Sequence, residues 1–131
     1  MESFNINTKK RREFLDITNE IKKLIKTSNI KNGICIVFVP HTTCGLTINE
    51  NADPSVREDI LLKLKELIPE NTNYSHIEGN SDAHISSSLL GHSLTLIIEN
   101  ADLKLGTWQG IYLCEFDGPR NRQVWIETIK K

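Results

Sequence analysis

Two segments of the chain are apolar on both faces of an extended strand, and they limit the fold more than any other feature. The run ICIVFV, from Ile34 to Val39, is continuous and rich in β-branched residues, which is typical of strands buried on both sides. The segment from Trp108 to Phe116 alternates, and both of its faces are largely apolar. In a chain of 131 residues, such a strand is predicted to lie at the centre of a sandwich or beneath another subunit.

Further strands are predicted toward both ends of the chain, with two to three helices inserted between them. Helices are expected at about residues 19–28, 54–68 and 83–90, and other strands at 3–8, 13–18, 46–49, 92–99, 101–106 and 122–129. This order predicts an α+β fold built on a mainly antiparallel β-sandwich. The segment DGPRN is expected to be a hairpin turn between the last two strands.

Length and charge restrict the class of protein. A chain of this length fits one domain, residues 1–131, with a core of its own. Sixteen lysines and arginines against seventeen acidic residues leave no net field that would attract nucleic acid or anionic lipid. No apolar segment approaches the roughly 20 residues of a membrane span. A cytoplasmic protein without nucleic-acid or membrane partners is therefore expected.

The segment HTTCGLTINENADPSV, residues 41–56, combines side chains typical of a reactive site with the start of a helix. Asp53 before Pro54 is a strong start signal, because Asp accepts from free amides and Pro fits the first helical position. Ser55 with Glu58 offers a rival capping box two residues later. Either way, the acidic end of this segment has a structural explanation.

His41 and Glu50 are close in sequence, yet they are not expected to meet within one chain. If TTCG forms a tight hairpin, Glu50 lies roughly 13 Å farther along the strand, at ~3.3 Å per residue. A site that uses both residues requires a wider connection or a neighbouring subunit. The two threonines after His41, with the amide of Gly45, could also form a small anion-binding turn.

The four histidines are not spaced for a preformed metal site, since no two lie three or four residues apart. A metal site would have to be assembled by the fold. His84 has the best physical case, because the positive end of a helix dipole keeps its ring neutral and able to ligate a metal or accept a proton. Asp82 could cap that helix or orient a histidine, and His92 has the weakest case.

Glu115 is a carboxylate on a mostly apolar strand face, so it needs a partner or a raised pKa. Arg120 or Arg122, just across the expected turn, is the nearest candidate. A structural ion pair at a hairpin end explains the residue as well as a functional role does.

Several segments in this order, HTTCGLTINENADPSV, GNSDAH, LGTWQGIY and EFDGPR, resemble the YjbQ family of small proteins. That family was long catalogued as uncharacterised and was later labelled secondary thiamine-phosphate synthase. The resemblance covers nearly the whole chain. It implies a seven- or eight-stranded α+β sandwich, assembled as a homotrimer whose sheets pack about the threefold axis.

The resemblance also implies a site shared among these motifs. Carried over by position, its residues are His41, His76, His84, Asp82, Glu50, Asp53, Gln109 and Arg120. Catalytic roles are expected for His41, His84, Asp82, Glu50, Gln109 and Arg120, and a zinc or magnesium ion is expected on His41, His76 and His84. Cys44 stands where relatives commonly carry small residues, which argues against a cysteine nucleophile.

The implied reaction joins a pyrimidine diphosphate to a thiazole phosphate with loss of pyrophosphate. The departing phosphates need cationic or metal stabilisation, for which the chain has Arg120 and Arg122 but no Gly-rich phosphate loop and no DDxxD-like cluster. We therefore expect weak or secondary activity on a small phosphorylated or anionic ligand. Two alternatives stay open: a non-catalytic trimer that binds a small anion or metal, and a metal-dependent hydrolase of unknown substrate.

Overall fold

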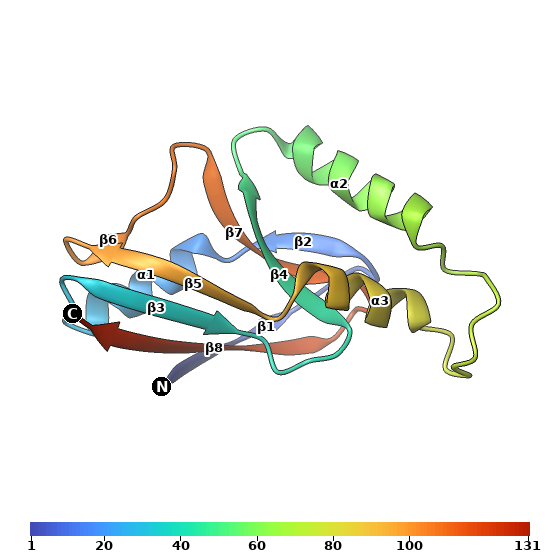
Figure 1. Cartoon of the computed structure of the whole chain (residues 1–131), viewed down its shortest axis with the longest axis horizontal. Coiled ribbons are helices and arrows are strands. Elements are labelled where there is room, and N and C mark those ends of the chain that lie inside the picture. The colour runs from blue at the N-terminus through green and yellow to red at the C-terminus, as the bar shows by residue number, and fades with distance from the viewer.

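Eight strands form two antiparallel sheets that face each other across a common core (Figure 1). The computed structural model describes all residues from 1 to 131. The five-stranded sheet has the order β1-β8-β3-β5-β6, and the three-stranded sheet has the order β2-β7-β4. The strands are β1 (Glu2–Asn7), β2 (Glu13–Asp16), β3 (Gly33–Phe38), β4 (Cys44–Glu50), β5 (Ser93–Glu99), β6 (Asp102–Leu103), β7 (Gln109–Glu115) and β8 (Asn121–Lys130). The helices are α1 (Thr18–Thr27), α2 (Pro54–Leu67) and α3 (Ser81–Leu90).

The main core lies between the two sheets and is closed at one side by α1. Inward-facing side chains such as Val37 of β3 and Leu113 of β7 meet there, with Ile21 and Ile25 from the apolar stripe of α1. A smaller cluster on the other face of β7 includes Phe14, Tyr112 and Phe116 and packs beneath α2 and α3. Strand β7 is thus covered on both faces within one chain. Of the two predicted positions, at the centre of a sandwich or beneath another subunit, it has the first.

The apolar run of β3 is buried on one side only. Cys35 and Val37 face the core and are fully buried, whereas Phe38 is 39% exposed. The expectation of a strand buried on both sides is therefore wrong for a single chain. The reason is topological, since α2 and α3 lie beside the three-stranded sheet and no element covers the outer face of the five-stranded sheet (Figure 1).

The hairpin expected at DGPRN does not form, and TTCG does not form the tight hairpin that was considered for it. DGPRN joins β7 to β8, but these strands belong to different sheets, because β2 and β4 occupy both edges of β7 while β1 and β3 occupy both edges of β8. TTCG leads from β3 in one sheet to β4 in the other. Both segments are connections between sheets and gather at the same end of the sandwich.

Helix α2 begins where the sequence predicts. The carboxylate of Asp53 accepts a hydrogen bond from the backbone N–H of Ser55 at 2.9 Å, and Pro54 occupies the first helical position. This bond lowers the pKa of Asp53. Unlike α1 and α3, α2 contributes no fully buried side chain. None of the helices is both long and apolar enough to cross a membrane.

Candidate functional site

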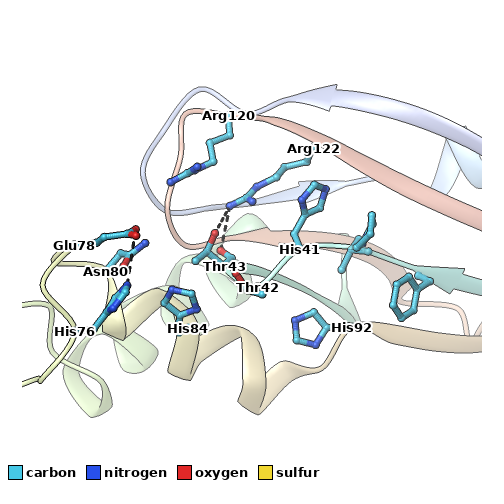
Figure 2. Close-up of a pocket in the computed structure, with 13 residues that line it drawn as sticks. His41, Thr42, Thr43, His76, Glu78, Asn80, His84, His92, Arg120 and Arg122 are labelled. Atoms are coloured by element: carbon cyan, nitrogen blue, oxygen red, sulfur yellow. Dashed lines mark hydrogen bonds and ion pairs between the residues drawn. The ribbon is translucent and has the colours of Figure 1, made fainter.

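A cavity of about 570 Å³ opens where the connections to β4 and β8 meet the start of α3. All four histidines of the chain line it. Figure 2 shows Arg120 and Arg122 on the β8 side and His76, His84 and His92 on the α3 side. The other lining residues are Phe38, Val39, Pro40, His41, Thr42, Thr43, Glu78 and Asn80.

Close packing of α3 on β4 brings the histidines to the cavity. A side chain at Gly45 would place its Cβ only 2.8 Å from the carbonyl oxygen of Gly91, so only glycine permits this approach. The hydroxyl of Ser87 on α3 donates to the carbonyl of Thr42 at 2.6 Å. These contacts fix the C-terminal half of α3 against the loop that carries His41, and His84 lies one turn before Ser87 on the same helix.

His41 is held by a single defined bond. Its Nε2 accepts the backbone N–H of Gln123 at 2.8 Å, so the proton of the neutral ring is on Nδ1. Burial lowers the pKa of His41, and the nearby Arg122 lowers it further. The ring is therefore neutral near pH 7, and Nδ1 is its free donor.

His76 and His84 stand edge to face, with ring centroids 5.4 Å apart. Glu78 lies beside them, with its Oε2 3.8 Å from Nε2 of His76. Two imidazoles and a carboxylate are a typical zinc donor set. However, no three such side chains converge closely enough to hold an ion in this arrangement. The donor chemistry fits a metal and the geometry does not, so the expected metal site stays a prediction.

Behind the cavity lies a buried ion pair between Glu115 and Arg122, whose side chains are 0% and 4% exposed. Arg122 donates from Nε to Oε1 at 2.9 Å, and its terminal nitrogen also donates to the hydroxyl of Thr43 at 2.8 Å. Thr8 donates to the same carboxylate at 2.7 Å. Burial alone would lower the pKa of Arg122, but its bonds to Glu115 and nearby negative groups raise it. The expected partner of Glu115 is thus Arg122.

Arg120 is the accessible cation of the site, with a side chain 52% exposed. It donates to the carboxylate of Asp117 at 2.8 Å, and the amide of Asn80 donates to the same oxygen at 2.9 Å. The side-chain oxygen of Asn80 is buried without a partner. Asn80 occupies the N-cap position of α3 but makes no capping bond with its side chain.

Four residues expected at the site from their positions in the sequence lie away from this cavity. Asp82 points to the β1–β2 connection, where Arg11 binds both of its oxygens at 3.0 and 3.2 Å. Glu50 and Gln109 are paired neighbours at the far end of the three-stranded sheet, roughly 20 Å from the start of β4 at ~3.3 Å per residue. Asp53 follows at that same end, and the side chain of Gln109 there accepts from the amide of Gly106.

Within one chain, the cavity therefore unites His41, His76, His84 and Arg120. Sequence reasoning missed Glu78 and Asn80, considered Thr43 only as part of an anion-binding turn, and gave His92 the weakest case among the histidines. The histidine of HTT and the segment GNSDAH are the sequence signals that indicate this cavity. Threonine and asparagine are common in loops and at helix caps, so Thr43 and Asn80 carry no functional signal of their own.

The comparisons with known proteins agree with this architecture. A family model described as UPF0047 protein YjbQ-like matches residues 2–131. The chain belongs to the YjbQ/UPF0047 family. A relative in this family, the UPF0047 protein of Methanocaldococcus jannaschii, is 56% identical over 126 residues, which cover 96% of this chain and 91% of the relative. The UPF0047 protein YugU of Bacillus subtilis is 48% identical over 130 residues and 98% of each chain.

Solved structures of YjbQ/UPF0047 proteins have the same fold. An uncharacterised member from Clostridium acetobutylicum superposes with a TM-score of 0.97 at 52% identity, over 98% of this chain and all of that one. A protein of unknown function from Sulfolobus solfataricus gives a TM-score of 0.95 at 34% identity, over 99% of this chain and 96% of that one. The resemblance seen in the sequence is confirmed for family and fold.

Proposed function

We propose that the histidine cavity binds a small phosphorylated ligand and that the protein acts on it as a weak, secondary thiamine-phosphate synthase. The observation that carries the proposal is the polarity of the cavity. Four imidazoles and the half-exposed guanidinium of Arg120 line it together with one carboxylate, Glu78. Such a surplus of donors suits an anion with several acceptor oxygens.

In the proposed transfer, each of these side chains has a separate role. A bond forms between the thiazole nitrogen and the pyrimidine methylene carbon, and the bond from that carbon to pyrophosphate breaks. Arg120 would stabilise the departing charge, and the Nδ1–H of His41 would donate to a phosphate oxygen. Arg122 is neutralised by Glu115 and holds Thr43 in place. With one solvent-accessible guanidinium, which is itself paired with Asp117, and no phosphate loop, slow turnover is the expected result.

A homotrimer is part of the same proposal. The outer face of the five-stranded sheet carries an apolar patch, which consists of Ile34, Ile36, Phe38, Ile97, Trp125 and Ile129. Its two halves meet at Ile36, which lies between Thr95 and Glu127. Ile34 lies beside both Ile97 and Ile129, and the rings of Phe38 and Trp125 stack with centroids 5.8 Å apart. A contiguous exposed patch of this kind supports burial against other copies of the chain. A site shared between subunits could then include Glu50, Asp53 and Gln109.

A metal-dependent hydrolase is the second candidate, favoured by the proximity of His76, His84 and Glu78. When bound, a zinc ion would supply Lewis-acid activation of water. The substrate or a neighbouring subunit would have to complete the ligand set. Metal analysis of untagged protein, before and after chelation, tests this candidate directly.

The test of the main proposal is an assay with the pyrimidine diphosphate and the thiazole phosphate, following thiamine phosphate and pyrophosphate. We expect slow turnover that falls at least about tenfold in Arg120→Gln, with no change in Lys104→Gln, whose exposed side chain lies outside the cavity. Saturable binding of the thiazole phosphate without turnover would identify a binding protein. The absence of both turnover and binding would contradict the proposal.

A further inference from the structure

Arg12, in the connection between β1 and β2, is a buried cation without a partner. All three of its guanidinium nitrogens are shielded from solvent and make no hydrogen bond. The group lies over the ring of Phe116, 5.4 Å from its centroid. Burial lowers the pKa of Arg12. A cation–π contact leaves all five N–H donors unused, and buried charges normally have hydrogen-bonding partners.

The nearby carboxylates are already taken. Arg11 binds both oxygens of Asp82, at 3.0 and 3.2 Å, and its Nε lies 3.3 Å from Glu70. Asp82 is 1% exposed, so this pair is fixed in the interior. No nearby protein carboxylate remains to form an ion pair with the guanidinium of Arg12.

Arg12 borders a groove of about 380 Å³ between the β1–β2 connection and α2. The groove shares no residue with the histidine cavity, and its lining residues are Lys10, Arg11, Arg12, Leu61, Leu62, Lys65 and Glu70. Its four cations face two carboxylates, Glu70 in the lining and Asp82 behind Arg11. Two positive charges are therefore left uncompensated.

We propose that this groove is a second ligand site, which binds a phosphoryl dianion, either inorganic phosphate or the phosphate of a small monoester. A phosphate group carries a charge of about −1.5 to −2 and three acceptor oxygens. This charge matches the excess of two positive charges in the groove, whereas a carboxylate would neutralise only one of them. The fork of Arg12 offers bidentate bonds to such an anion, with Lys10 and Lys65 at the entrance.

Access to Arg12 depends on α2. The guanidinium nitrogens are closed off when the groove is empty, so an anion reaches them only if the neighbouring wall moves. Helix α2 supplies Leu61, Leu62 and Lys65 to that wall. It packs on the smaller core cluster through side chains that are only partly buried, such as Leu61 and Leu64. A small outward shift of α2 opens the site, and a bound phosphate then ties α2 to the β1–β2 connection.

The test is titration with inorganic phosphate, followed by calorimetry and by hydrogen exchange of residues 54–67. In the wild type, phosphate should slow exchange in α2. In Lys10→Gln/Lys65→Gln, phosphate affinity of the groove should fall at least about tenfold and the protection of α2 should vanish. The matched control is Lys9→Gln/Lys63→Gln, which removes the same charge from adjacent exposed positions outside the groove. The control should behave as the wild type.

A second variant tests Arg12 itself. In Arg12→Met the unpaired charge is replaced by an apolar side chain that packs well on Phe116. Its melting temperature without phosphate should equal or exceed that of the wild type, and phosphate should no longer slow hydrogen exchange in α2. A groove variant indistinguishable from the lysine control, or an Arg12→Met protein in which phosphate still protects α2, would overturn the proposal. Arg120→Gln should leave the protection of α2 unchanged, so the groove and the histidine cavity are tested separately.

Discussion

At the scale of single residues, the four histidines share a cavity but differ in what holds them. His41 is tied to the backbone of β8 through Nε2, whereas His76 and His84 contact each other through their rings. The first arrangement fixes a tautomer and leaves a donor, which suits His41 to an anion. His76 and His84 bring two imidazoles close to Glu78, but the three side chains do not converge closely enough to hold a metal ion.

The lowered pKa of His41 makes the stability of the fold depend on pH. In the unfolded chain a histidine titrates near 6.5, and in the folded chain His41 titrates at lower pH, first because of burial and then because of Arg122. Between these two values the unfolded state binds more protons, so this contribution to stability is complete above about pH 6.5 and is lost as the pH falls. The free energy of unfolding of His41→Gln, measured with denaturant between pH 5 and 7, should depend less steeply on pH than that of the wild type. An unchanged slope would contradict the assignment.

Cys44 illustrates a residue that looks reactive in the sequence and is inert in the fold. Burial raises its pKa to about 12, so almost no thiolate exists near neutral pH, and the thiolate is the nucleophile. Cys44→Ala should keep the turnover or ligand affinity of the wild type within about twofold. Loss of activity in a variant that still folds, measured with the synthase assay, would restore a catalytic role to the thiol.

At the scale of elements, local sequence signals predicted individual helices and strands well and their partners poorly. Asp53 and Pro54 start α2 as predicted, and the stripe of Ile21 and Ile25 faces the core. The alternation of β7 predicts which side chains share a face, but it carries no information on which strand lies alongside. For this reason the hairpin predicted at DGPRN was wrong.

The same limit applies to the site. His76 and His92 come from connections between elements, where no period indicates a direction, and they reach the cavity only because α3 packs on β4. Asp82 was expected near a histidine, yet its partner Arg11 is 71 residues earlier in the chain. Pairings across such separations depend on the complete topology. The local pattern did not predict it, and the family resemblance implied a sandwich without its strand order.

The ion pair that links β7 to β8 should be the most sensitive point of the sandwich. Glu115→Gln leaves the guanidinium of Arg122 buried without its counter-charge, and breaking such a pair costs about 3–5 kcal/mol. The free energy of unfolding, from denaturant titration, should fall by that amount. Glu66→Gln, which affects an exposed pair with Lys63, should change it by less than about 1 kcal/mol. Similar losses in the two variants would contradict this interpretation.

At the scale of the whole molecule, the uncovered face of β3 predicts assembly. Light scattering coupled to size exclusion at micromolar concentration should give three times the mass of one chain. Ile97→Lys places a charge on the β5 side of the apolar patch, beside Ile34, where the isoleucine is 58% exposed in the single chain, and should yield monomers. Leu89→Lys, at a 65% exposed position of α3, should remain trimeric. A wild-type monomer would remove the basis for a site shared between subunits.

The most direct measurement for the histidine cavity is the affinity for the thiazole phosphate in His41→Ala and His84→Ala, together with their melting temperatures. Both side chains are partly exposed in the cavity wall and neither belongs to the core clusters. Each variant should bind at least about tenfold more weakly, near 1.4 kcal/mol, while its melting temperature stays close to that of the wild type. Variants that melt much earlier yet bind as tightly as the wild type would contradict a functional cavity and leave the histidines a structural role.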